Sequence, residues 1–205
     1  MLKDKGLYRT SALVVLVLAL VSTVVPSVLA CSEGESRRAI QMANQTIYNY
    51  ARKNPDKAGN LGTTVTCALV WHEYLVVANV GDSRAYLFRD NEIEQLTYDH
   101  SFVGQLVREG RLNQEAYYTH PRRNVITRAL GQRSDIQVDV FTQQIDKGDV
   151  FLLCSDGLWE MVRDPEIAKH LHDMENPFLT VQRLVALANA YGGTDNISVV
   201  VGKIK

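Results

Sequence analysis

Residues 151–160 constrain this chain most, because an apolar run there is followed directly by an aspartate and a glycine, Asp156 and Gly157. The apolar residues 150–154 predict a buried strand, which places the Asp156 carboxylate at the rim of a core, on backbone that can bend sharply. Two interpretations are open from this stretch alone: a ligand position, or an ordinary turn at the end of a strand. The rest of the chain has to separate them.

The composition predicts one globular domain. The chain has 205 residues, of which 46% are hydrophobic and 22% are charged, enough to form one sizeable core. A formal net charge of -1 with scattered basic residues argues against a nucleic-acid partner. Three cysteines give neither the even count of a disulfide framework nor the spacing of a zinc site, and Cys67 and Cys154 are expected to be buried thiols.

Residues 1–31 differ from the rest of the chain. Basic residues up to Arg9 precede an apolar run, and short side chains lead to Ala30 and Cys31, as in a secretory signal cleaved after Ala30. Such cleavage would leave Cys31 as a possible site of lipid attachment. Residues 12–30, about 19 residues, are also near the length of an uncleaved membrane anchor. A buried pair of strands in a soluble domain is the third interpretation.

We therefore predict that residues 1–31 are a signal peptide or membrane anchor and that residues 32–205 form the folded domain. The basic flank would stay inside, and the domain would be exported or held at the membrane through residues 12–30. If the segment is not a true signal, the protein is expected to be cytoplasmic.

Periodicity predicts an α+β fold. The expected helices cover residues 35–53, 102–110, 164–172 and 176–190, and the expected strands cover residues 63–70, 74–80, 83–89, 93–97, 136–141, 150–154 and 197–204. Residues 111–131 are polar and irregular and are expected to form a surface loop or a phosphate-facing flap. Because strands and helices do not alternate regularly, we expect largely antiparallel sheets.

Two acidic motifs share a form. Asp156 follows a predicted strand, and Asp195 precedes the last one, in Thr194-Asp195-Asn196. Carboxylates on neighbouring strand ends suit Mg²⁺ or Mn²⁺, which prefer oxygen ligands, whereas the scattered histidines make zinc a poorer candidate. Each aspartate taken singly fits a turn residue as well.

Six motifs occur along the chain in a recognisable order: Gly62-Thr63-Thr64; Val80-Gly81-Asp82-Ser83-Arg84-Ala85-Tyr86; Asp99-His100-Ser101; the stretch from His120 to Gly131; Cys154-Ser155-Asp156-Gly157-Leu158-Trp159; and Gly193-Thr194-Asp195-Asn196. From about residue 37 to residue 203 the chain thereby resembles the metal-dependent protein phosphatases, also called type 2C serine/threonine phosphatases, in their bacterial form. The resemblance implies a sandwich of two antiparallel β-sheets flanked by helices, with a two-metal site at one end.

The resemblance also implies a reaction and its residues. A water bound between two Mg²⁺ or Mn²⁺ ions would attack the phosphorus of a phosphoserine or phosphothreonine. Asp156 and Asp195 match metal ligands of the family, and Asp99 matches a ligand of a third, more weakly bound metal. Asp82 more closely matches a residue that holds a structural turn, although in some relatives the matching aspartate reaches a third metal.

Residues 105–131 correspond to the family's flap beside the cleft. Arg122, Arg123 and Arg128 in this segment could meet an anionic substrate, because a guanidinium matches phosphate geometry. The partners implied are phosphoproteins or a serine/threonine kinase.

The chain departs from the family pattern at its start. Family members carry an Arg, an Asn-Glu-Asp segment and an Asp-Gly-x-Gly-Gly turn whose Asp bridges both metals, but no Asp occurs here between Asp4 and Asp56. We therefore expect an N-terminally incomplete sandwich, weak metal binding and weak or absent activity by the chain alone. The alternatives are a non-catalytic phosphatase-like binding module and a truncated gene product.

Overall fold

The computed structural model describes residues 17–19 and 27–205. Most of the segment predicted as a signal or anchor, namely residues 1–16 and 20–26, lies outside the described residues. Within the described ranges, no helix combines the length and apolarity needed to cross a membrane.

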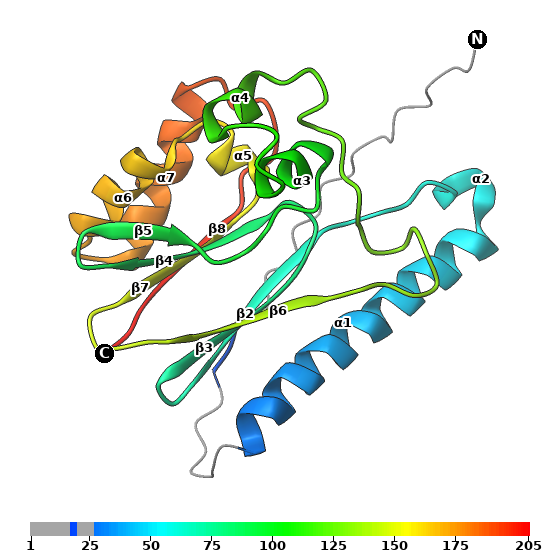
Figure 1. Ribbon diagram of the computed structural model, residues 1–205, viewed down its shortest axis with the longest axis horizontal. Coiled ribbons are helices and arrows are strands. Elements are labelled where there is room, and N and C mark those ends of the chain that lie inside the picture. Colours follow the sequence, from blue (N-terminus) through cyan, green and yellow to red (C-terminus); the bar gives the residue numbers. More distant parts are fainter. Residues whose placement is uncertain (1–16, 20–26) are drawn as a thin grey trace.

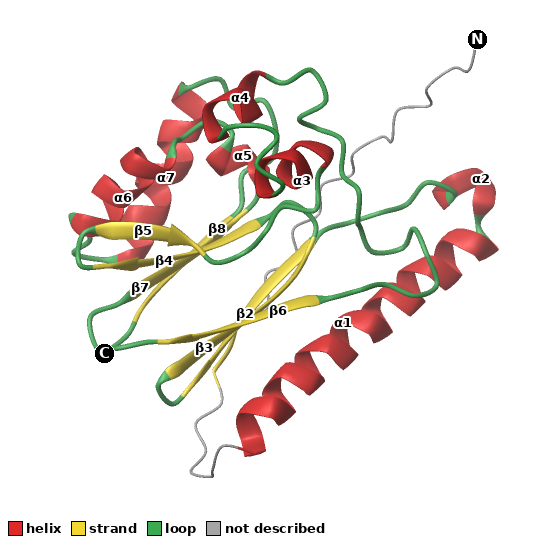
Figure 2. Ribbon diagram, in the orientation of Figure 1, coloured by secondary structure: helices red, strands yellow, loops and turns green. Residues whose placement is uncertain are grey.

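Two four-stranded sheets form the centre of the fold (Figures 1 and 2). The strands of the first sheet are, in spatial order, β1 (Val17–Ala19), β2 (Val65–Trp71), β3 (Tyr74–Val80) and β6 (Asp139–Gln144). Those of the second sheet are β5 (Glu92–Gln95), β4 (Arg84–Arg89), β7 (Val150–Cys154) and β8 (Val199–Lys203). All described strand pairs are antiparallel except β1 with β2, which is parallel. The predicted α+β sandwich of two antiparallel sheets is confirmed, with that one parallel pair added.

Helices flank both outer faces of the sandwich (Figure 1). The helices on the side of the first sheet are α1 (Ser27–Lys53) and α2 (Pro55–Ala58), and those on the side of the second are α3 (Phe102–Arg108), α4 (Gln114–Thr119), α5 (Asp156–Trp159), α6 (Asp164–His172) and α7 (Pro177–Ala190).

Three apolar clusters hold these layers together. Between α1 and the first sheet, Ile40 belongs to one cluster with Ala78 and Val138. Between the two sheets, residues such as Leu75 and Leu153 are fully buried. A third cluster, which includes Trp159, packs the second sheet against its helices. Each cluster removes apolar surface from water, which is the main force that holds the layers together.

Two element boundaries differ clearly from the predicted ones. The helix predicted over residues 35–53 begins at Ser27 and so runs across the predicted domain boundary at residue 31. The strand predicted over residues 136–141 is β6, Asp139–Gln144, because Ile136 and Val138 pack into the α1 layer and the pairing with β3 starts only at Asp139.

The short helices α4 and α5 lie where the sequence predicts loop or turn. In α4, the Asn113 side chain accepts a hydrogen bond from the Ala116 amide at 2.7 Å, and Tyr117 is buried. In α5, all four residues are buried. Helical periodicity cannot be recognised in so few residues, so tertiary packing decides both elements.

Candidate active site

Asp156 lies where the central strand β7 ends. The strand is buried along its whole length between β4 and β8, and Ser155 continues it in extended backbone before α5 begins at Asp156. The Asp156 side chain is buried, and its Oδ1 accepts a hydrogen bond from the Gly157 amide at 2.9 Å. The strand therefore delivers a carboxylate to a fixed place at one end of the sandwich.

Ser155 joins this strand end to the loop that carries Asp195. Its hydroxyl donates to the Asn196 carbonyl at 3.0 Å and accepts from the Ser198 amide at 3.0 Å, and its amide donates to the Ser198 carbonyl at 3.0 Å. The structure thus brings together the two segments whose aspartates the sequence singles out.

Gly157 allows the two segments to approach closely. A Cβ at this position would lie 2.4 Å from the Asn196 carbonyl oxygen and 3.3 Å from that of Asp195. Asp195 is half-buried, and its Oδ1 accepts from the Asn196 amide at 2.7 Å. A larger residue than glycine would push the two acidic segments apart.

The donor set fits one hydrated Mg²⁺ or Mn²⁺ ion. Such ions keep several waters and need only one or two protein carboxylates, which Asp156 and Asp195 can supply. Within residues 17–19 and 27–205, no group of three or more His, Cys, Asp or Glu side chains is arranged to hold a metal. The metal roles of Asp156 and Asp195 stay predictions.

Asp82 lies in the turn between β3 and β4. Its carbonyl accepts from the Trp159 indole at 3.0 Å, and its side chain is buried. The preceding Gly81 has a φ of +119°, and a Cβ there would lie 2.3 Å from Thr64 Cγ2. The Asp82 carbonyl thus links the turn to the helix that begins at Asp156, and the structural role of Asp82 stays a prediction.

Asp99 forms a buried ion pair with Arg84. The Arg84 Nη2 donates to Asp99 Oδ2 at 2.7 Å, and both side chains are almost fully buried. The guanidinium carbon of Arg84 lies 3.6 Å from the centre of the Trp159 ring. The sequence singled out Asp99 but not its partner, because no local pattern pairs residues 84 and 99.

The three flap arginines have different surroundings. Arg122 is exposed, with its guanidinium 3.7 Å from the centre of the Phe102 ring, and Arg123 is half-buried. Arg128 forms an ion pair with Asp139 at 2.6 Å. Arg128 is thus engaged by a protein carboxylate on β6, so of the three it is the least suited to meet a substrate phosphate.

His100 is a structural residue that sequence reasoning left without a role. Its Nδ1 accepts from the Gly81 amide at 3.0 Å, and its Nε2 lies 3.0 Å from Asp139 Oδ2 and 3.0 Å from Arg128 Nη1. Burial lowers the pKa of His100 and favours the neutral ring. The ring links the turn at Gly81 to β6. The sequence signal that could have pointed to His100 is its position in the Asp99-His100-Ser101 motif.

Comparison with known proteins gives the family. The model of the family described as protein phosphatase 2C matches residues 27–197. The chain belongs to the protein phosphatase 2C family.

The relatives are bacterial phosphatases. The serine/threonine phosphatase stp of Listeria welshimeri is 41% identical over 163 residues, which cover 80% of this chain and 64% of the relative. The serine/threonine protein phosphatase PstP of Mycobacterium tuberculosis is 39% identical over 166 residues, which cover 81% of this chain and 32% of the relative. The chain thus spans about 64% of the length of the Listeria relatives that it matches.

Solved structures agree with the fold. The serine/threonine phosphatase Stp1 from Staphylococcus aureus superposes with a TM-score of 0.82 at 37% identity, covering 90% of this chain and 71% of that one. The catalytic domain of PstP in complex with two manganese ions superposes with a TM-score of 0.76 at 34% identity, covering 84% of this chain and 71% of that one.

Proposed function

We propose that this chain acts as a Mg²⁺- or Mn²⁺-dependent protein phosphatase that hydrolyses phosphoserine and phosphothreonine esters. One observation carries the proposal: Ser155 holds the Asp156 strand end against the Asp195 loop, in a chain of the protein phosphatase 2C family. The manganese ions of the PstP catalytic domain support this choice of metal.

Each part of the site has a proposed task. A bound Mg²⁺ or Mn²⁺ ion would activate a water molecule and neutralise phosphoryl oxygens. Asp156 and Asp195 would hold the ion, and the Ser155 hydrogen bonds would keep the two carboxylates in a fixed position relative to each other. Arg122 and Arg123 are the flap arginines proposed to meet the substrate phosphate, since guanidinium groups bind phosphate through two parallel hydrogen bonds.

We also propose that metal binding and turnover by the chain alone are weak. Two carboxylates balance one dication, and the Asp-Gly-x-Gly-Gly motif does not occur in the sequence. The loss of a group that merely supports a ligand often weakens metal binding by about 10–100-fold, and a missing ligand should weaken it more. The partners proposed are phosphoproteins or a serine/threonine kinase, since the relatives are named as serine/threonine phosphatases.

Hydrolysis of a phosphothreonine peptide by the full chain with Mn²⁺ tests the activity. We expect slow, metal-dependent phosphate release that Asp156→Asn and Asp195→Asn abolish and that Asp135→Asn, at an exposed residue, leaves unchanged. Release that needs no metal, or that survives both substitutions, would contradict the proposed function. A rate that matches a full-length relative under the same conditions would contradict the proposed weakness.

A second candidate is a non-catalytic phosphatase-like binding module. The observation that favours it is the small donor set, with no three-residue group of metal-binding side chains in the described part of the chain. Binding of the same phosphopeptide without phosphate release would support this candidate.

For localisation, we propose a signal or anchor in residues 12–30, supported by the apolar run alone. The pairing of β1 with β2 and the start of α1 at Ser27 support the competing interpretation, in which the segment folds into the domain. Cell fractionation separates the two: a full-length product in the soluble cytoplasmic fraction would contradict the signal or anchor.

A further inference from the structure

We propose that Asp99 is the fixed counter-ion of Arg84 rather than a ligand of a third metal, and that the pair positions Trp159, at the end of the helix that begins at Asp156. The proposal rests on the proposed function in one respect, because the position of α5 matters for metal binding only if Asp156 holds the metal.

Both oxygens of the Asp99 carboxylate are engaged by side-chain N–H groups. Oδ1 accepts from Arg84 Nε and from Gln95 Nε2, both at 3.0 Å, and Oδ2 accepts from Arg84 Nη2 at 2.7 Å and from Nε at 3.2 Å. The single Nε hydrogen is shared between the two oxygens, so three N–H groups, two of them from the Arg84 guanidinium, engage the carboxylate. A metal ion would have to compete with this charged group at either oxygen, so Asp99 does not fit the predicted third site.

Arg84 needs this carboxylate. The arginine is 1% exposed, and its Nη1 donates to the Tyr86 hydroxyl at 3.1 Å. A buried guanidinium is tolerated only when it is paired with an anion and its donors are satisfied. A dication shared with Asp99 would place two cations on one buried carboxylate, which favours the ion pair over the metal.

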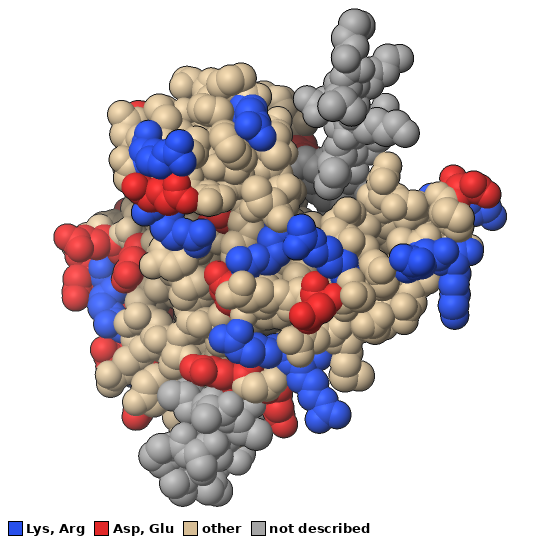
Figure 3. All heavy atoms as spheres, turned by 45° about the vertical axis from the view of Figure 1, so that its right-hand side comes forward, with Lys and Arg blue, Asp and Glu red and all other residues tan. Residues whose placement is uncertain are grey.

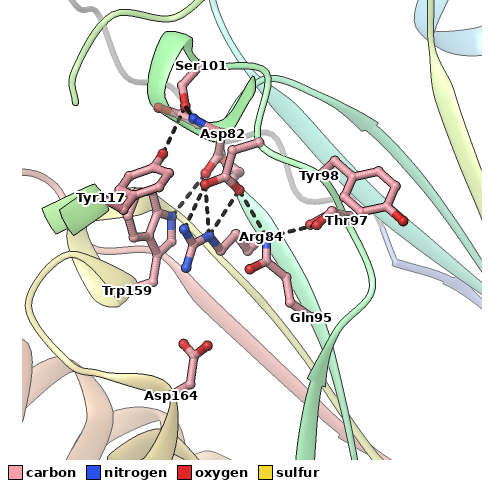
Figure 4. Close-up of polar contacts among 12 residues, drawn as sticks. Asp82, Arg84, Gln95, Thr97, Tyr98, Ser101, Tyr117, Trp159 and Asp164 are labelled. Carbon is pink, nitrogen blue, oxygen red and sulfur yellow. Dashed lines mark hydrogen bonds and ion pairs between the residues drawn. The ribbon is translucent and has the colours of Figure 1, made fainter. Parts of the chain in front are cut away.

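Trp159 connects the ion pair to the candidate site. The Arg84 guanidinium stacks on the Trp159 ring at 3.6 Å, the Trp159 indole donates to the Asp82 carbonyl, and the Tyr117 ring of α4 meets it edge-on at 5.5 Å (Figure 4). Trp159 is the last residue of α5, and Asp156 is the first. The place of Arg84 therefore fixes α5 against β4 and against the flap helix α4.

The chain offers a matched control on the same strand. At the other end of β4, Arg89 pairs with Asp149 through two hydrogen bonds, at 2.9 and 2.5 Å. Removing this pair also breaks an arginine–aspartate contact, but at the opposite end of β4 from Arg84.

The experiment uses the full chain with the substitution Trp71→Phe. This removes one of the two tryptophans of the sequence, so that the fluorescence reports on Trp159. The variants are Asp99→Asn, Arg84→Met, the double variant, Asp149→Asn as the control and Asp156→Asn as the loss of a metal ligand. The readouts are the number and affinity of bound Mn²⁺ ions, from the paramagnetic resonance of free Mn²⁺, and the emission maximum of Trp159.

We expect Asp99→Asn to keep the number of bound Mn²⁺ ions, to weaken their binding by about tenfold and to shift the Trp159 emission. Arg84→Met should do the same, and the double variant should add little, because the two residues act as one unit. Asp149→Asn should change neither readout, and Asp156→Asn should remove bound Mn²⁺.

Loss of one Mn²⁺ in Asp99→Asn, with the ion retained in Arg84→Met, would overturn the proposal and restore Asp99 as a metal ligand. If the parent chain binds no Mn²⁺, the proposed function fails. The emission maximum of Trp159 then tests the positioning role, and an unchanged maximum in Asp99→Asn would overturn it.

If these variants do not fold, Arg84→Lys takes their place. Lysine keeps the charge but cannot form the planar fork or stack in the same way on Trp159. We expect a shifted emission with the same number of bound ions, and an unchanged emission and affinity would overturn the proposal.

Discussion

Gly157 and Asn196 are in such close contact that a Cβ on Gly157 would lie 2.4 Å from the Asn196 carbonyl oxygen. This contact brings the backbone after Asp156 directly against the backbone after Asp195. The two residues are far apart in the sequence, and the antiparallel pairing of β7 with β8 places them at the same end of the sheet.

The substitution Gly157→Ala should therefore destabilise the fold by about 1–3 kcal/mol, since the added methyl group meets backbone that cannot move freely. Thermal unfolding measures the effect as a fall in Tm of several degrees. Gly34→Ala is the control: nothing lies within 4 Å of its added Cβ, and alanine in a helix should raise stability by up to about 1 kcal/mol. Equal effects of the two substitutions would contradict the steric interpretation.

Removing the Ser155 hydroxyl should loosen the same junction. Ser155→Ala leaves the Ser198 amide and the Asn196 carbonyl without their side-chain partner, at a cost of about 1–3 kcal/mol. Mn²⁺ affinity should fall by about 10–100-fold, because the carboxylates lose the support that orients them. Calorimetric titration with Mn²⁺ measures this, and exposed Ser134→Ala is the control. Unchanged affinity in Ser155→Ala would show that the hydroxyl does not support the site.

Asn44 ties α1 to the loop before β6. Its side chain is buried, donates to the Arg133 carbonyl at 3.0 Å and accepts from the Gly131 amide at 2.8 Å. Asn44→Ala should cost about 1–3 kcal/mol in urea unfolding, because both backbone groups lose their partner. Asn49→Ala, on the exposed side of α1, should stay within about 0.5 kcal/mol. Similar losses at both positions would rule out a specific anchoring role.

The Arg89 and Asp149 pair should make stability depend on pH. Hydrogen bonds from Arg89 lower the pKa of Asp149. A carboxylate whose folded pKa lies below its unfolded value, about 3.9, stabilises the fold above that value, and the contribution is lost as pH falls through the folded pKa. The parent chain should thus exceed Asp149→Asn in stability at pH 7, and the difference should shrink below about pH 4.

Urea unfolding of the two proteins between pH 7 and pH 3 measures that difference. A gap that stays constant over the whole range would mean that the charge of Asp149 is not the stabilising feature.

The fold class and the candidate aspartates could be predicted from the sequence because their signals are local. The apolar run before Asp156 predicts a buried strand, and β7 is that strand. The motif order predicted the family, which comparison with known proteins confirms. Element boundaries were less accurate where long-range pairing sets them, as at β6, whose start depends on β3.

Only the tertiary structure decided which groups meet. The sequence by itself determined that a buried strand ends at an aspartate followed by a glycine, which places a carboxylate at the rim of a core. The folded chain decided that the Asp195 loop lies against it through Ser155, and that Asp99 faces Arg84. These pairings join residues distant in sequence, and a local pattern has no means to select them. The cost of leaving a buried charge or hydrogen-bonding group without a partner selects them instead.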